Sequence, residues 1–284
     1  MKASRWFVVL AGVFAGAGAS GALAQIGPIV YVTTNGPLDS TDFKQVTAEC
    51  PPGTIAFSGG ANISAGAEQP IIMHQSLPQG SPPSSWLAVA QERIPTIVQW
   101  RLTAHAVCAA VPGYELVEDT SPFDSSSLKL VAANCPPGKV PIGGGGGIFF
   151  FNPDLALFEF APTSAGWEVA AQESTPFAGN WLLSVKVSCA PSVDVLRISA
   201  LTDNPVETRD VLELVCPLPR VLIGGGTRVT PGEAVYASHP VSNFGWEVGG
   251  RRITADPWVL GGSALCLSPV LFADGFESGD TSGW

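Results

Sequence analysis

The sequence is poor in charge, and poorest in positive charge. Charged residues make up 13% of the chain, and 14 Lys and Arg oppose 24 Asp and Glu, for a formal net charge of -10. This surplus of negative charge would repel a nucleic-acid backbone. The composition therefore argues against nucleic-acid binding.

Long apolar runs are missing beyond the first two dozen residues. Lys2 and Arg5 precede an apolar run from Trp6 to Ala19, and Ala22-Leu23-Ala24 supplies small residues for cleavage. The pattern is typical of a Sec-type secretory signal peptide, and it is too short and too glycine-rich for a membrane-spanning helix. We expect residues 1–24 to be removed, the protein to be secreted or displayed at the cell surface, and no transmembrane segment to remain.

Motifs that carry chemistry are missing as well. The chain has no Gly-x-Ser-x-Gly elbow, no His-Glu-x-x-His and no cysteine beside a histidine that would indicate a nucleophile. Its three histidines, His74, His105 and His239, show no metal-ligand spacing. The sequence therefore predicts no catalytic residue, no metal and no cofactor.

Glycine and proline, by contrast, are abundant, with 32 and 25 copies. With few long helix-forming stretches, this composition favours short strands joined by tight turns. Trp167–Ala171 and Trp181–Val187 alternate with period two, as a half-buried antiparallel strand does. The sequence therefore predicts an all-β fold.

Three segments of about 80 residues can be superimposed on their cysteines. Cys50, Cys135 and Cys216 each open a Cys-Pro turn, and a glycine pair follows nine and ten residues later. Each copy then carries two tryptophans and a closing cysteine. We predict three homologous antiparallel β modules of about six strands each, at residues 25–110, 111–191 and 192–268.

Two arrangements of these modules fit the sequence. The copies could form tandem two-layer sandwiches, or each copy could supply one face of a single pseudo-threefold β-prism. The residues that follow, 269–284, form an acidic tail outside the repeat. This tail resembles short tails of exported bacterial proteins, which would make it a sorting signal, and the alternative is a solvated chain end.

Six cysteines behind a signal peptide indicate an oxidising compartment where disulfides persist. We predict one bond within each module, because each copy then carries its own complete staple: Cys50–Cys108, Cys135–Cys189 and Cys216–Cys266. The rival pairing joins Cys108 to Cys135 and Cys189 to Cys216, leaving Cys50 and Cys266 to pair.

The glycine pairs allow two interpretations. Glycine-rich loops can bind phosphate, but no pair is followed by the Lys-Ser/Thr of a P-loop or by a helix pattern. We therefore expect the missing side chains to let a bulky neighbour, such as the recurring tryptophan, lie against the backbone.

A few residues are weak candidates for ligand contact. Trp100, Trp181 and Trp258 could stack on sugars if they were exposed, although a recurring tryptophan in a small β module is usually core. His74 and His239 lie 24 and 23 residues after the first cysteines of their copies, which suggests equivalent positions. The partner suggested by such residues is a glycan or another cell-surface component.

The Cys-Pro-x-Gly turn, the glycine triplet, the Gly-Trp strand and the closing Val-x-Cys-Ala resemble repeats of uncharacterised secreted bacterial proteins over residues 29–268. Copy three departs from the pattern at Pro219 and Leu267. That resemblance implies no catalytic residues. The plan also resembles, in architecture alone, the vitelline membrane outer layer protein, a three-faced β-prism, and this licenses no function.

These observations favour an exported, non-enzymatic scaffold with a binding or structural role. Packing residues recur in every copy, whereas no reactive constellation does. A lectin-like carbohydrate-binding protein is the second hypothesis, and a secreted hydrolase is the third.

Overall fold

A computed structural model describes residues 26–64, 71–203, 207–254 and 256–269. Within these residues the chain forms 18 strands and no helix. The predicted signal peptide and residues 270–284 of the predicted tail lie outside the described residues. The all-β prediction is confirmed, and each copy contributes six strands.

The strands follow the chain in three sets of six, one set to a copy. The first set is β1 (Val30–Asn35), β2 (Phe43–Glu49), β3 (Ile55–Ser64), β4 (Ile71–Gly80), β5 (Pro83–Glu92) and β6 (Arg101–Ala109). The second is β7 (Glu115–Thr120), β8 (Leu128–Asn134), β9 (Lys139–Phe149), β10 (Leu155–Pro162), β11 (Gly166–Glu173) and β12 (Leu182–Pro191). The third is β13 (Val195–Asp203), β14 (Arg209–Val215), β15 (Val221–Val229), β16 (Ala234–Pro240), β17 (Gly245–Arg251) and β18 (Val259–Leu267).

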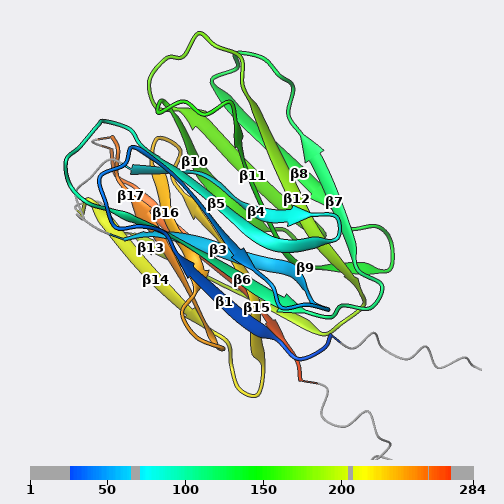
Figure 1. Ribbon diagram of the computed structural model, residues 1–284. Helices are drawn as coiled ribbons and strands as arrows, with labels where there is room; N and C mark the ends of the chain where they lie inside the picture. The colour runs from blue at the N-terminus through cyan, green and yellow to red at the C-terminus, as the bar shows by residue number, and fades with distance from the viewer. Residues whose placement is uncertain (1–25, 65–70, 204–206, 255, 270–284) are drawn as a thin grey trace, which may run out of the picture.

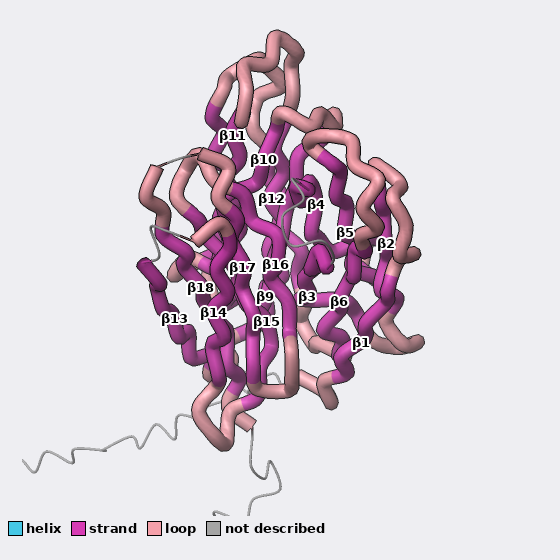
Figure 2. The backbone as a smooth tube through the Cα atoms, turned by 90° about the vertical axis from the view of Figure 1, so that its left-hand side faces the viewer, coloured by secondary structure: helices cyan, strands magenta, loops and turns pink. Residues whose placement is uncertain are grey.

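These strands form three six-stranded antiparallel sheets around one interior (Figure 1). Face I has the order β1-β6-β3-β16-β17-β14, face II has β13-β18-β15-β10-β11-β8, and face III has β2-β5-β4-β9-β12-β7. Figure 2 shows face I from β14 and β17, through β16 and β3, to β6 and β1. Of the two predicted arrangements, the prism is the one observed.

The sharing of faces differs from the prediction that each copy supplies one face. The first, sixth and third strands of a copy form half of one face, and its fourth, fifth and second strands form half of another. The third strand of each copy pairs with the fourth strand of a different copy, at β3·β16, β15·β10 and β4·β9. The three copies are therefore interlocked in a ring, and none has a sheet of its own.

The glycine pair explains how this interlocking is possible. A Cβ added at the first glycine of each pair (Gly59, Gly144, Gly225) would collide with the indole of the same copy's inner tryptophan (Trp86, Trp167, Trp246). A Cβ added at the second (Gly60, Gly145, Gly226) would collide with the backbone of the neighbouring copy's fourth strand. One glycine thus admits the tryptophan, as predicted, and the other admits the adjacent copy.

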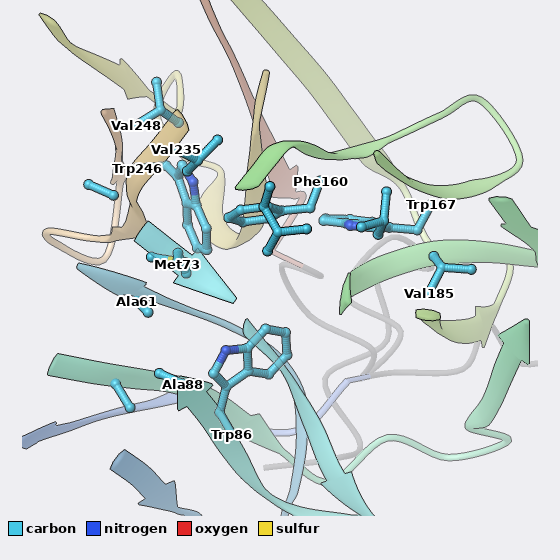
Figure 3. Packing of buried hydrophobic residues seen from close by; sticks show 14 of the residues in the cluster. Ala61, Met73, Trp86, Ala88, Phe160, Trp167, Val185, Val235, Trp246 and Val248 are labelled. Carbon is cyan, nitrogen blue, oxygen red and sulfur yellow. The ribbon is translucent and has the colours of Figure 1, made fainter. Parts of the chain in front are cut away.

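The three inner tryptophans are fully buried and point into the common interior, with Met73 and Phe160 among them (Figure 3). In copies one and three the indole Nε1 of the tryptophan donates to a serine, from Trp86 to Ser76 at 3.0 Å and from Trp246 to Ser238 at 3.1 Å. Phe160 occupies the serine position in copy two, and the Nε1 of Trp167 has no hydrogen-bond partner there. Packing alone therefore holds the indole ring of Trp167.

The disulfides join Cys50 to Cys108, Cys135 to Cys189 and Cys216 to Cys266, as predicted. They lie at the end of the prism that carries the short Cys-Pro turns. Gly53 and Gly138 in these turns both have φ of +83°, in the left-handed region that glycine adopts without strain. Copy three makes its turn with Pro219 instead, after a cis peptide bond.

The opposite end of the prism carries the longer connections, among them those between β1 and β2, β7 and β8, and β9 and β10. We call it the loop end. No helix in the described ranges is long and apolar enough to cross a membrane.

Candidate binding surface

One transverse row of side chains crosses each face at the level of the second glycine. The first glycine of the pair faces the inner tryptophan, so strand alternation turns the second glycine outward. On face I the pairing register aligns one residue from each strand. In order across the face they are Thr33, His105, Gly60, His239, Glu247 and Glu213.

The missing side chain of Gly60 lets two histidines meet. His105 is on β6 and His239 is on β16, so the two strands are separated by β3. Their rings stack across the glycine position with centroids 4.6 Å apart and planes 18° from parallel. Both histidines are buried, at the joint between the first and third copies.

The hydrogen bonds of the two rings differ. His105 has Thr33 Oγ1 3.1 Å from Nδ1 and Asn62 Oδ1 3.1 Å from Nε2, a pair of contacts that a neutral ring satisfies by accepting from the hydroxyl and donating to the amide oxygen. Burial, together with a smaller effect of the neighbouring His239, lowers the pKa of His105 to about 3. His105 is therefore neutral over the ordinary range of pH.

His239 faces acceptors on both sides. Its Nδ1 lies 3.2 Å from the Pro240 carbonyl oxygen, and its Nε2 lies 3.2 Å from Glu247 Oε1. Only a ring that carries both protons donates to both atoms. The hydrogen bond from His239 also lowers the pKa of Glu247, so the row contains a carboxylate with a defined partner.

A cavity of about 410 Å³ opens beside this row. The Arg209 guanidinium lies 4.1 Å from the centre of the Tyr236 ring, in cation–π contact. Arg209 and Glu247 bring one positive and one negative charge to the wall, so the cavity is nearly neutral overall. The lining residues are Asn62, Ile63, Ser64, Arg209, Val211, Tyr236, Ala237 and Glu247.

The equivalent rows on the other faces have different chemistry. Face III carries Glu118, Lys186, Gly145, Leu77, Leu87 and Thr47. Face II carries Ser199, Ser263, Gly226, Ala161, Glu168 and Ala132. Face III thus has an ion pair of 2.8 Å beside an apolar cluster, and face II has a serine pair hydrogen-bonded at 2.9 Å.

The structure places the predicted tryptophan contacts in the interior. Trp100, Trp181 and Trp258 are each at most 1% exposed, so they offer no stacking platform to a sugar, and this hypothesis is corrected. The ammonium groups of Lys44 and Lys129 lie 4.7 and 4.9 Å from the Trp100 and Trp181 rings and help to cover them. At Trp100 and Trp181 a lysine of the same copy therefore occupies the ring face that the alternative hypothesis assigned to a ligand.

The two predicted histidines are not equivalent to each other. His74 is the bulged residue of β4, and the corresponding bulges of β10 and β16 contain Phe158 and Tyr236. His239 instead occupies the strand position that Leu77 has in copy one and Ala161 has in copy two. Counting from the cysteines misaligned them because the connection before the fourth strand is shorter in copy three.

His74 is fully buried, and neither ring nitrogen has a hydrogen-bond partner. Burial lowers its pKa to about 4. It lies against the Phe151 ring, with centroids 5.5 Å apart, and has no cavity beside it among those described. The structure therefore separates His74 from His239.

Four residues of the face I site were not anticipated, namely Asn62, His105, Arg209 and Glu247. Strand alternation gave one usable signal, since His105 lies three residues before Cys108 on the outward side of its strand. Nothing in a single sequence indicates that β3 and β16 are neighbours. Within the described residues, no group of three or more His, Cys, Asp and Glu side chains is arranged to hold a metal ion.

Comparison with known proteins adds nothing to this picture. No protein-family model matches the chain. No curated protein matches it either. The interpretation of function therefore rests on the three faces and the loop end.

Proposed function

We propose that the protein is an exported, non-enzymatic scaffold with a binding or structural role, in which one repeated interior carries three different faces. The observation that carries the proposal is the contrast between inside and outside. The glycine pair, the inner tryptophan and the disulfide recur three times, whereas the outward rows of the three faces share only their glycine.

The face I row supports a role beyond folding. Burying an imidazole and fixing it with two hydrogen bonds costs free energy that a serine or an alanine at the same place would avoid. Faces II and III fold with Ser263 and Lys186 in the position of His105. The histidine is therefore not required by the fold, and we attribute it to the contacts that face I makes.

The compartment follows from the disulfides together with the proposed signal peptide. Three disulfides indicate an oxidising environment outside the cytoplasm. We propose that residues 1–24 direct this export. Expression with and without them, followed by fractionation, tests this step: the full chain is expected outside the cytoplasm, shortened at its N-terminus, and retention of an uncleaved chain would contradict it.

A functional test separates a scaffold from an enzyme. The purified, oxidised protein is assayed against polysaccharide and ester substrates, and in parallel for retention on cell-envelope fractions. We expect background turnover together with retention that a face I variant, His239→Ala with Asn62→Ala, loses. Turnover above background that depends on any residue of the chain would favour the hydrolase and contradict the proposal.

Carbohydrate binding is the second candidate, and the face I cavity favours it. The cavity combines an amide, a hydroxyl, a guanidinium and a carboxylate with apolar wall residues, and its charges balance. Such a lining suits a neutral ligand with many hydroxyl groups better than a phosphate or a polyamine. This site replaces the buried tryptophans as the basis for the carbohydrate hypothesis.

A glycan array tests this candidate with a matched control. Glu247→Gln on face I removes a carboxylate from the cavity wall, and Glu168→Gln changes the residue at the same position on face II. We expect binding to fall at least about tenfold in the first variant and to be unchanged in the second. No binding by the parent protein across the panel, or equal losses in both variants, would remove the carbohydrate hypothesis and leave the scaffold standing.

A further inference from the structure

Phenylalanine side chains gather in the open at the loop end of copies one and two. Five of them are between 36% and 59% exposed: Phe43, Phe123, Phe149, Phe150 and Phe151. We call them the aromatic loop surface. An exposed aromatic cluster of this kind is uncommon on a soluble protein and marks an interaction site.

Two ring contacts link the connection after β9 to the connection between β7 and β8 and to the start of β2. Phe150 lies 4.7 Å from Phe123, which belongs to the connection between β7 and β8. Phe151 lies 5.3 Å from Phe43 at the start of β2. The segment that follows β9 therefore bridges copies one and two.

The backbone of Phe150 adopts a sterically unfavourable conformation. Phe150 has φ of +70°, and it is the one non-glycine residue with positive φ in the described part of the chain. Steric contact of the Cβ with the backbone disfavours the left-handed region for a residue other than glycine. Strain at an exposed aromatic residue is typical of a site whose geometry serves a contact rather than the core.

Exposed hydrophobic residues also recur at equivalent positions of copies one and two, outside the hydrophobic core. Leu38 and Phe123 occupy the same position of the Pro-x-Asp-Ser turns in copies one and two, and both are about half exposed. Phe43 and Leu128 are a second such pair, each directly before a buried lysine. Recurrence outside the core suggests that copies one and two share a contact.

The charges around the surface indicate the partner. Lys44 and Lys129 are buried and paired with Asp39 and Asp124, so their charge is already neutralised. Two exposed acids are close to these rings in sequence: Asp42 directly precedes Phe43, and Asp119 lies four residues before Phe123. With a net charge of -10 over the chain, an anionic partner or an anionic lipid surface would be repelled.

We propose that the aromatic loop surface docks a cationic polypeptide segment that carries arginine and apolar side chains. Guanidinium groups would lie on the exposed phenylalanine faces and pair with the acids at the rim, while the apolar side chains cover the rings. This goes beyond the proposed function, because it names a partner class at a surface distinct from face I.

The test uses defined probes and the full oxidised chain. Two synthetic peptides of equal length are titrated by calorimetry, one alternating Arg with Leu and one alternating Glu with Leu, and vesicles of zwitterionic phosphatidylcholine serve as the lipid probe. The variant is Phe123→Ser with Phe150→Ser. The matched control is Phe244→Ser, which removes a phenylalanine that is 36% exposed at the opposite end of the prism.

We expect the Arg peptide to bind at least about tenfold more tightly than the Glu peptide, and the double variant, but not Phe244→Ser, to lose at least about tenfold in affinity. Asp42→Asn with Asp119→Asn should weaken binding and reduce its salt dependence. Equal binding of both peptides, equal losses in all variants, or vesicle binding without peptide binding would each overturn the proposal. Phe150→Gly, which relieves the backbone strain, replaces the double variant if the latter does not fold.

Discussion

Acid should destabilise the protein through its buried histidines, and His105 allows this to be tested singly. Its pKa in the folded protein is about 3, against an ordinary value of 6.5. Between these values the unfolded chain binds a proton that the folded chain does not, so stability is lost as the pH falls from 6.5 towards 3. At pH 4.5 the cost is about 3 kcal/mol relative to pH 8.

His74 contributes to the same loss, because burial lowers its pKa to about 4. By the same relation its cost at pH 4.5 is slightly under about 3 kcal/mol, so the two histidines together account for about 5–6 kcal/mol. The groups that face His105 are Thr33, Asn62 and His239, with Glu247 behind His239. The free energy of unfolding should therefore fall steeply over this interval.

The assay is urea denaturation of the parent protein and of His105→Gln at pH 8 and at pH 4.5. Glutamine keeps a polar group near Thr33 and Asn62 but cannot titrate, so the variant should lose about 3 kcal/mol less than the parent between the two pH values. His74→Gln gives a second, independent difference. Parallel losses in parent and His105→Gln would refute the conclusion that His105 is held neutral by burial.

Three further perturbations test how the prism is held together, each measured by denaturant unfolding. Gly144→Ala should cost at least about 3 kcal/mol, because its Cβ would meet an indole ring and a backbone carbonyl, whereas Gly138→Ala, with open space around it, should cost only the left-handed φ, about 1 kcal/mol. Similar costs for the two would contradict this assignment. Ser76→Ala should cost about 1–2 kcal/mol by leaving a buried indole N–H unpaired, and no change would refute that bond's contribution. Replacing Cys135 and Cys189 together by alanine should cost about 4 kcal/mol for a separation of 54 residues, and an unchanged midpoint under oxidising conditions would argue against the bond.

Features that lie within one copy were predictable from the sequence. The recurring cysteines gave the disulfide pairing, because a bond inside each copy is the arrangement that can be repeated. The glycine pair and the following tryptophan gave their mutual packing, because a bulky ring against a strand needs a residue without a side chain. Both depend on local spacing, which a single sequence displays.

Features that join different copies were not predictable. The contact between His105 and His239 depends on the pairing of β3 with β16, and no spacing within a copy indicates which strand edges meet. The supposed equivalence of His74 with His239 was wrong because the connection before the fourth strand is shorter in copy three, which shifts its residues relative to the first cysteine. The burial of Trp100 agrees with the favoured interpretation of a core residue, but a lysine, a residue type that is mostly exposed, could not be anticipated as part of its cover.

Differential scanning calorimetry of the oxidised full chain tests the interlocked prism most directly. Because every face contains strands of two copies, no copy can unfold without opening the sheets of the others. A single transition is predicted, in which the calorimetric and van't Hoff enthalpies agree. Three transitions, or a calorimetric enthalpy about three times the van't Hoff value, would show independent modules and contradict the shared faces.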